Sequence, residues 1–190
     1  MLGLLVLIAT ASAEAPLTET EREAIDRGET IYRVRRAGRH THAFAAVAVE
    51  ANRETIWREV LNYDAYARRM PYVTRSSRDL TVVTPAHTEV LCTMEVTVRG
   101  IATTYRVRNL WYPSADLILF QMEPNGWSAL EAASGVWRVE PYQQDKSLLT
   151  YSLDLTTAWY VPSTLRDRAA RGLPRVARAI ARAAEAAATD

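Results

Sequence analysis

The sequence predicts an α+β fold, in which a curved antiparallel sheet of about six to seven strands wraps round a long C-terminal helix. The first observation is that apolar and polar residues alternate with a period of two in successive segments from residue 87 to residue 157. The second is that short turns join these segments, which implies antiparallel neighbours. The third is the segment from residue 163 onward, whose apolar residues recur at helical spacing.

Composition and charge narrow the classes of protein to which the chain can belong. With 190 residues, of which 48% are hydrophobic and 24% charged, it is most simply one globular domain. Basic and acidic residues are interleaved and the net charge is +1, so a nucleic-acid partner is not expected. Cys92 is the sole cysteine, so the chain cannot form an intramolecular disulfide.

The N-terminal 13 residues predict a signal peptide. An apolar run is followed by Ala11-Ser12-Ala13, the small-x-small pattern of a signal-peptidase site, although the usual basic opening is absent. The run is too short to cross a bilayer as a helix. We therefore expect an exported, periplasmic or extracellular protein, or a cytoplasmic one if the segment is not a signal.

Residues 14–42 are expected to form an N-terminal extension, and residues 43–190 the folded domain. In the extension, Thr18 and Glu21 have the spacing of a capping box, which predicts a short helix that ends near Gly28. The segment 30–44 is a possible strand.

Two short helices are predicted directly after the first strand of the domain. The apolar run 43–51 has the length of a strand, and Asn52 stands where an N-cap belongs, ahead of apolar residues at helical spacing. A second helix, over roughly residues 64–69, is closed by Pro71, because proline disfavours helical geometry in the residue before it.

The strands that follow each have an apolar and a polar face. In the first of them Val90, Cys92, Met94 and Val96 share one face. The later strands are expected at 103–112, 117–122, 135–142 and 147–157, with turns at 113–116 and 143–146. The final helix has an alanine-rich apolar face, and Gly172 and Pro174 should bend it.

This order of elements resembles the helix-grip fold of the START, polyketide cyclase and coenzyme-Q-binding superfamily. The segments that carry the resemblance are "VEANRETIWREVLNYDAYARRMPYV", "GVWRVEPY", "LLTYSLDL" and "VPSTLRDRAARGLPRVARAI". The resemblance covers about residues 43–187. The resemblance implies a cavity between the sheet and the C-terminal helix. Periodicity alone favours a filled apolar core at the same place.

The resemblance implies that the inward side chains bind a small hydrophobic molecule in this cavity. The expected lining residues are Val90, Met94, Tyr105, Val107, Asn109, Trp111, Phe120, Met122, Trp137, Tyr151, Leu153, Leu173, Val176 and Ile180. Asn109 either orients a ligand or bonds the backbone at a bulge. Trp127 either lines a portal or rests on the long helix.

Candidate catalytic and metal-binding groups are few, and we predict no catalytic residue, no metal site and no cofactor. His40 and His42 would point the same way from a strand, with His87 as a potential third ligand, but no carboxylate or cysteine cluster accompanies them. Cys92 is expected to pack in the core. Arg106 and Arg108 should point outward and pair with Glu89 or Glu95, whereas a one-residue slip would turn them inward.

The leading functional hypothesis is a binder, and possible transporter, of a lipid, isoprenoid or quinone-like molecule, with transient membrane contact. A polyketide cyclase or aromatase is an alternative that needs acid-base groups in the cavity. A protein-interaction module with a vestigial cavity is a third. The sequence leaves the oligomeric state open.

Overall fold

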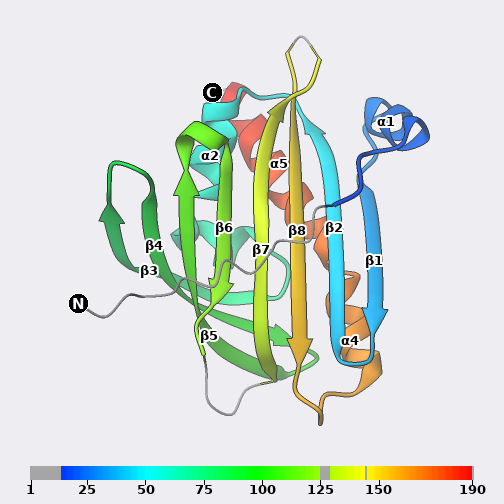
Figure 1. The fold of residues 1–190 in the computed structure, drawn as a ribbon, viewed down its shortest axis with the longest axis vertical. Coiled ribbons are helices and arrows are strands. Elements are labelled where there is room, and N and C mark those ends of the chain that lie inside the picture. Colours follow the sequence, from blue (N-terminus) through cyan, green and yellow to red (C-terminus); the bar gives the residue numbers. More distant parts are fainter. Residues whose placement is uncertain (1–13, 125–128, 144, 190) are drawn as a thin grey trace.

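The computed structural model describes residues 14–124, 129–143 and 145–189, and Figure 1 shows their arrangement. The strands are β1 (Ile31–Ala37), β2 (His40–Val49), β3 (Val73–Val83), β4 (Thr88–Val98), β5 (Ile101–Tyr112), β6 (Leu117–Met122), β7 (Leu130–Pro141) and β8 (Ser147–Thr157). The helices are α1 (Glu19–Asp26), α2 (Arg53–Val60), α3 (Tyr66–Arg69), α4 (Ser163–Ala170) and α5 (Leu173–Thr189), with 3-10 turns at Tyr63–Ala65 and Pro113–Ala115.

The strands form one antiparallel sheet, and the C-terminal helix α5 lies across one of its faces, behind the sheet in Figure 1. The order across the sheet is β1-β2-β8-β7-β6-β5-β4-β3. This arrangement confirms the predicted fold class. The described residues form eight strands, however, where the sequence predicted about six to seven.

The additional strands are those at the two edges of the sheet. The segment 30–44, predicted as one possible strand, contains β1 and the beginning of β2, because Gly38 adopts a positive φ of 58° and turns the chain between them. The predicted strand 43–51 is the remainder of β2. β3 is exposed along most of its length, since only β4 pairs with it, so its sequence lacks the alternation of a half-buried strand. The sequence therefore predicted no separate strand over these residues.

The two short helices after β2 form where the sequence predicted them. The side chain of Asn52 accepts a hydrogen bond from the backbone N–H of Thr55 and caps α2. The second predicted helix begins as a 3-10 turn at Tyr63–Ala65 and continues as α3. It ends at Met70, which is extended because Pro71 follows.

The C-terminal segment is interrupted rather than merely bent. Helix α4 ends at Ala170 and α5 begins at Leu173, and the carbonyl of Gly172 accepts hydrogen bonds from the N–H groups of Arg175 and Val176. Pro174 lies in the first turn of α5, where no intrahelical donor is required. The break therefore costs no hydrogen bond at the proline.

Two apolar cores lie on opposite faces of the sheet. The main core fills part of the space between the sheet, α2 and α5, around Trp57, Ile118, Leu149 and Ile180. A smaller core on the other face consists mainly of Ile25, Phe44, Ala46 and Leu148. Ile25 belongs to helix α1, whose N-terminus has the predicted capping box of Thr18 and Glu21.

The segment predicted as a signal peptide, residues 1–13, lies outside the described residues, so export stays a prediction. Within the described part of the chain, no helix is both long enough and apolar enough to span a membrane.

Candidate functional site

A cavity of about 240 Å³ lies between the concave face of the sheet, the 3-10 turn at Tyr63–Ala65 with α3, and the helices α4 and α5. Side chains from all these elements contribute to its lining, and most of the lining is apolar or aromatic. The predicted site residues that line it are Met94, Tyr105, Val107, Asn109, Phe120, Trp137, Tyr151, Leu153 and Val176. A cavity of this kind suits a small hydrophobic molecule.

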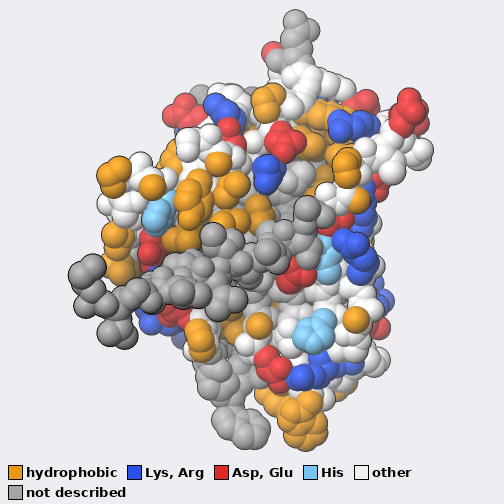
Figure 2. Space-filling view, viewed as in Figure 1, with side chains coloured by type: hydrophobic (Ala, Val, Ile, Leu, Met, Phe, Trp, Pro, Cys, Tyr) orange, Lys and Arg blue, Asp and Glu red, His pale blue; other side chains and the backbone are white. Residues whose placement is uncertain are grey.

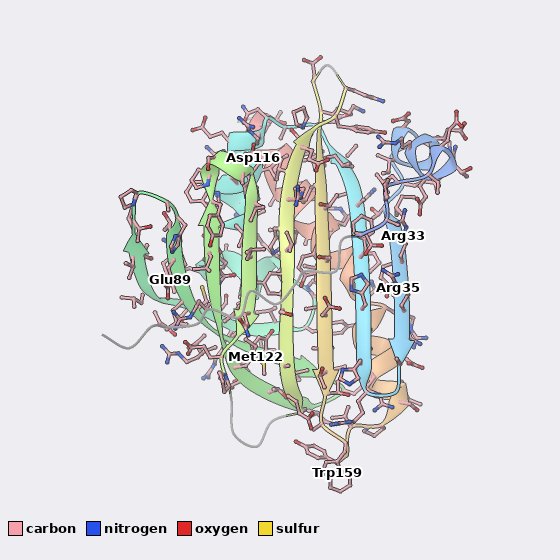
Figure 3. All side chains as sticks on the ribbon, viewed as in Figure 1. Arg33, Arg35, Glu89, Asp116, Met122 and Trp159 are labelled. Carbon is pink, nitrogen blue, oxygen red and sulfur yellow. The ribbon has the colours of Figure 1, made fainter. Side chains whose placement is uncertain are left out.

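Four other predicted site residues lie outside the lining. Val90 and Ile180 are buried in the main core, and Trp111 packs against it. Met122, which Figure 3 labels near the end of β6, is buried opposite Val107 in the register. The cavity does not reach these residues, although Val90, Trp111 and Met122 lie on the inward face of the sheet. The side chain of Leu173, like Trp127, lies outside the described residues.

An aromatic cluster forms one wall of the cavity. Tyr151 is stacked with Phe120 at a centroid distance of 5.7 Å and contacts Trp137 at 4.2 Å. Gly135 on β7 gives the Phe120 ring its room, because a Cβ there would lie 2.4 Å from the ring's Cζ and 2.0 Å from the backbone oxygen of Ser152. The wall offers ring faces and edges to a ligand.

The phenols of Tyr105 and Tyr151 are polar groups of the lining. Burial raises the pKa of Tyr105 to about 12. Burial, and to a smaller extent the nearby Tyr105, raises the pKa of Tyr151 above its ordinary value. Both phenols are therefore neutral at physiological pH and can donate or accept hydrogen bonds without carrying charge.

Asn109 is committed to the protein backbone. Its buried side-chain amide donates to the carbonyl oxygens of Val90 and Val107, each at 3.3 Å. This matches the alternative in which the residue bonds backbone, although the pairing of β5 with β4 is continuous and contains no bulge there. Its neighbour Cys92 is fully buried, and burial raises the pKa of the thiol to about 12, as expected for a packing residue.

Arg106 and Arg108 point away from the cavity, as the register predicted. Arg108 pairs with Glu89, which Figure 3 labels on β4, and with Glu123 at 3.0 Å. Arg106 pairs with Asp79 and Glu123, each at 3.5 Å, rather than with Glu95. Neither guanidinium reaches the lining.

Several lining residues were missed by the sequence analysis. Tyr63, Tyr66, Met70 and Tyr72 come from the 3-10 turn, from α3 and from the turn that follows α3, which close the cavity at one side. The run of three tyrosines was visible in the sequence, but no periodicity assigned them to a site. Arg166 on α4 also lines the cavity and was not among the predicted site residues.

The side chains of His40 and His42 project from the outer face of β2, and both point to the same side, as predicted. His42 is held between Asp154 at 2.8 Å and Glu14 at 2.7 Å, while His40 bonds the hydroxyl of Thr156. His87 packs its ring against Tyr112 instead. Among the described residues, no cluster of three or more histidine, cysteine or acidic side chains is arranged to hold a metal ion.

Comparisons with known proteins agree with this architecture. The family described as "Polyketide cyclase / dehydrase and lipid transport" matches residues 49–180. No curated protein sequence matches significantly.

Solved structures with a similar fold share little sequence with this chain. The STAR-related lipid transfer protein of Xanthomonas axonopodis has a TM-score of 0.65 and 14% identity, covering 85% of this chain and 94% of that fragment. The Zhui aromatase/cyclase of a Streptomyces species has a TM-score of 0.63 and 17% identity, covering 79% and 94%. A START superfamily protein of Mycobacterium smegmatis has a TM-score of 0.58 and 18% identity, covering 78% and 97%. These likenesses concern the fold.

Proposed function

The chain belongs to the polyketide cyclase / dehydrase and lipid transport family, and from this premise we propose that it binds and carries a small hydrophobic molecule such as a lipid, an isoprenoid or a quinone. The observation that carries the proposal is the cavity of about 240 Å³ with its largely apolar lining. Transfer of apolar surface from water into such a space is the main source of binding free energy.

The chemistry of the lining favours a carrier over a catalyst. Aspartate, glutamate, histidine, lysine and cysteine are absent from the described residues that line the cavity. General acid-base catalysis works best with a group whose pKa lies near the working pH. The phenols of Tyr105 and Tyr151 have pKa values raised away from that range.

A polyketide cyclase or aromatase is the second candidate, and one observation favours it. The guanidinium of Arg166 belongs to a lining residue, and a cation near a ligand carbonyl can stabilise an enolate as it forms. The third hypothesis, an interaction module, expects a filled core, whereas the described residues enclose open volume.

We also propose that the protein touches a membrane transiently when it exchanges its ligand. Trp159 is 76% exposed and Tyr160 is 44% exposed in the loop between β8 and α4. Figure 3 shows Trp159 projecting beyond the end of β8, and Figure 2 shows an apolar cluster at that end of the molecule. The neighbouring Val161 lines the cavity, and aromatic side chains favour the membrane interface.

Native mass spectrometry of the purified chain from Glu14 onward, followed by organic extraction, tests the proposal. We expect a stoichiometric hydrophobic compound that is recovered chemically unchanged after prolonged incubation. Conversion of the compound to a cyclised product would favour the cyclase instead. A chain that stays empty when offered lipid, isoprenoid and quinone mixtures would contradict carrier function.

Two adjacent alanines on β7 provide a matched pair of variants for this experiment. Ala133 is buried and lines the cavity, whereas Ala132 is exposed on the other face. Ala133→Phe should fill the cavity and abolish co-purification, while Ala132→Phe should retain the compound. Thermal unfolding of both variants establishes that each is folded before the comparison is made.

A further inference from the structure

Arg166 is the one charged residue among the described residues that line the cavity. It lies on α4, at the end of the sheet where β2 begins and β8 ends. The ion pair between Asp167 and Arg36, at 2.9 Å, ties this helix to β1. Arg36 is opposite Thr41 in the β1–β2 register, and Thr41 also lines the cavity. The cavity thus has a cationic, hydroxyl-bearing end.

Other arginines near this end have protein partners. Arg39 pairs with Glu131 at 2.7 Å, and Arg36 pairs with Asp167 at 2.9 Å. The guanidinium of Arg166 makes no ion pair with a described residue, and its backbone N–H donates to the carbonyl of Pro162. Within the described part of the chain, no carboxylate therefore balances the charge of Arg166 at the cavity wall.

The side chain of Arg166 is partly withdrawn from water, which weakens the hydration of its charge without replacing it. A planar guanidinium matches the two oxygens of a carboxylate and can bind them with two parallel hydrogen bonds. A ligand that brings its own carboxylate would supply the missing partner, and the Thr41 hydroxyl could donate a further hydrogen bond.

The rest of the cavity suits the other part of such a ligand. The aromatic cluster of Phe120, Trp137 and Tyr151 belongs to the same lining, and the phenols there are uncharged. The lining thus combines an aromatic wall for the apolar part of a ligand with one cationic residue for a polar head group.

We propose that the ligand is an apolar carboxylic acid, of the fatty-acid type, whose carboxylate pairs with Arg166. This inference rests on the proposed function and specifies the chemical class of its ligand. Arg166 acts as the specificity-determining residue, because an uncharged analogue with the same chain would leave its guanidinium unpaired.

Isothermal titration with decanoic acid and with 1-decanol tests the inference, since the two probes share a chain and differ in the head group. At neutral pH we expect the acid to bind wild-type protein about 10-fold to 100-fold more tightly than the alcohol. Arg166→Gln should remove this preference while leaving the affinity for 1-decanol unchanged, and Arg166→Lys should retain part of it. Arg175→Gln, at an exposed position of α5, is the control and should behave as wild type.

The pH dependence supplies a second readout. The preference for the acid should disappear as the pH falls below the carboxyl pKa of about 4 to 5, because the protonated acid no longer carries a charge. Equal affinity of wild-type protein for acid and alcohol would overturn the inference and leave the carrier proposal standing. An equal loss of affinity for decanoic acid and for 1-decanol in Arg166→Gln would also overturn the inference. Absence of binding by either probe and by the lipid mixtures would overturn both.

Discussion

Gly135 shows how one residue shapes the cavity wall. A Cβ at this position would lie 2.0 Å from the backbone oxygen of Ser152 and 2.4 Å from the Phe120 ring. The first contact involves the backbone of β8, so it cannot be relieved by a side-chain rotation. Gly135→Ala should therefore lower the free energy of unfolding by about 3 kcal/mol, as measured by urea denaturation.

Ser134→Ala is the control for this prediction. It alters the neighbouring residue of β7 without adding a Cβ, and its effect should stay within about 0.5 kcal/mol of wild type. An equally small effect of Gly135→Ala would mean that β7 and β8 move apart without strain.

His42 predicts a pH-dependent contribution to stability. Burial lowers its pKa, but the hydrogen bonds to Glu14 and Asp154 and the charges of both carboxylates outweigh burial, and the pKa is raised above 6.5. The pKa of Glu14 is lowered from 4.5, since its bonds to His42 and Arg33 outweigh its own burial. The His42 contribution is thus complete below pH 6.5 and is lost as the pH rises through the raised pKa.

Urea denaturation at about pH 5.5 and about pH 8.5 measures this contribution. The free energy of unfolding should fall more steeply between these pH values in wild type than in His42→Gln. His40→Gln, which removes the exposed neighbour on the same face, should keep the wild-type slope. Identical slopes for wild type and His42→Gln would show that the imidazole gains nothing from its two carboxylates.

At the scale of elements, the loop between β8 and α4 is predicted to carry the membrane contact. The double variant Trp159→Ala and Tyr160→Ala should reduce co-sedimentation with phospholipid vesicles about tenfold, because both aromatic side chains leave the interface. The folded protein should keep its cavity, since neither residue lines it.

Val83→Ala is the matched control for the loop. Val83 is 75% exposed at the end of β3, so its substitution also removes exposed apolar surface, but from a different element. If both variants sediment with vesicles as wild type does, the loop has no role in membrane contact.

For the whole molecule, we predict that the exported form begins at Glu14. Expression of the full chain in a bacterial host, fractionation and N-terminal sequencing measure this directly. Glu14 pairs with Arg33 at 3.2 Å and with His42, so the predicted cleavage site is immediately followed by a residue anchored to the sheet. Recovery of uncleaved chain from the cytoplasm alone would contradict export.

Ala13→Asp provides the control for cleavage, because it places a charged residue at the position where a signal peptidase requires a small one. The uncleaved precursor should accumulate in this variant. A variant processed at the same site would show that another protease generates the mature end.

Local signals determined most of the fold, because the physical causes of these elements act between residues close in sequence. The capping residues Thr18 and Asn52 mark helix starts through hydrogen bonds within the same turn. Pro71 ends α3 through a steric clash with the preceding residue. Alternation places Arg106 and Arg108 on the outer face because successive strand residues point to opposite sides.

What the sequence by itself determined, then, is the identity and order of most elements and the faces that their side chains share. The tertiary structure alone decided that β1 and β3 extend the sheet at its edges, that Val90 and Ile180 meet packed neighbours while Tyr105 and Tyr151 meet a cavity, and that Arg166 reaches that cavity. Periodicity fixes a direction relative to one element, whereas the volume in front of a side chain depends on sheet curvature and on where the helices lie.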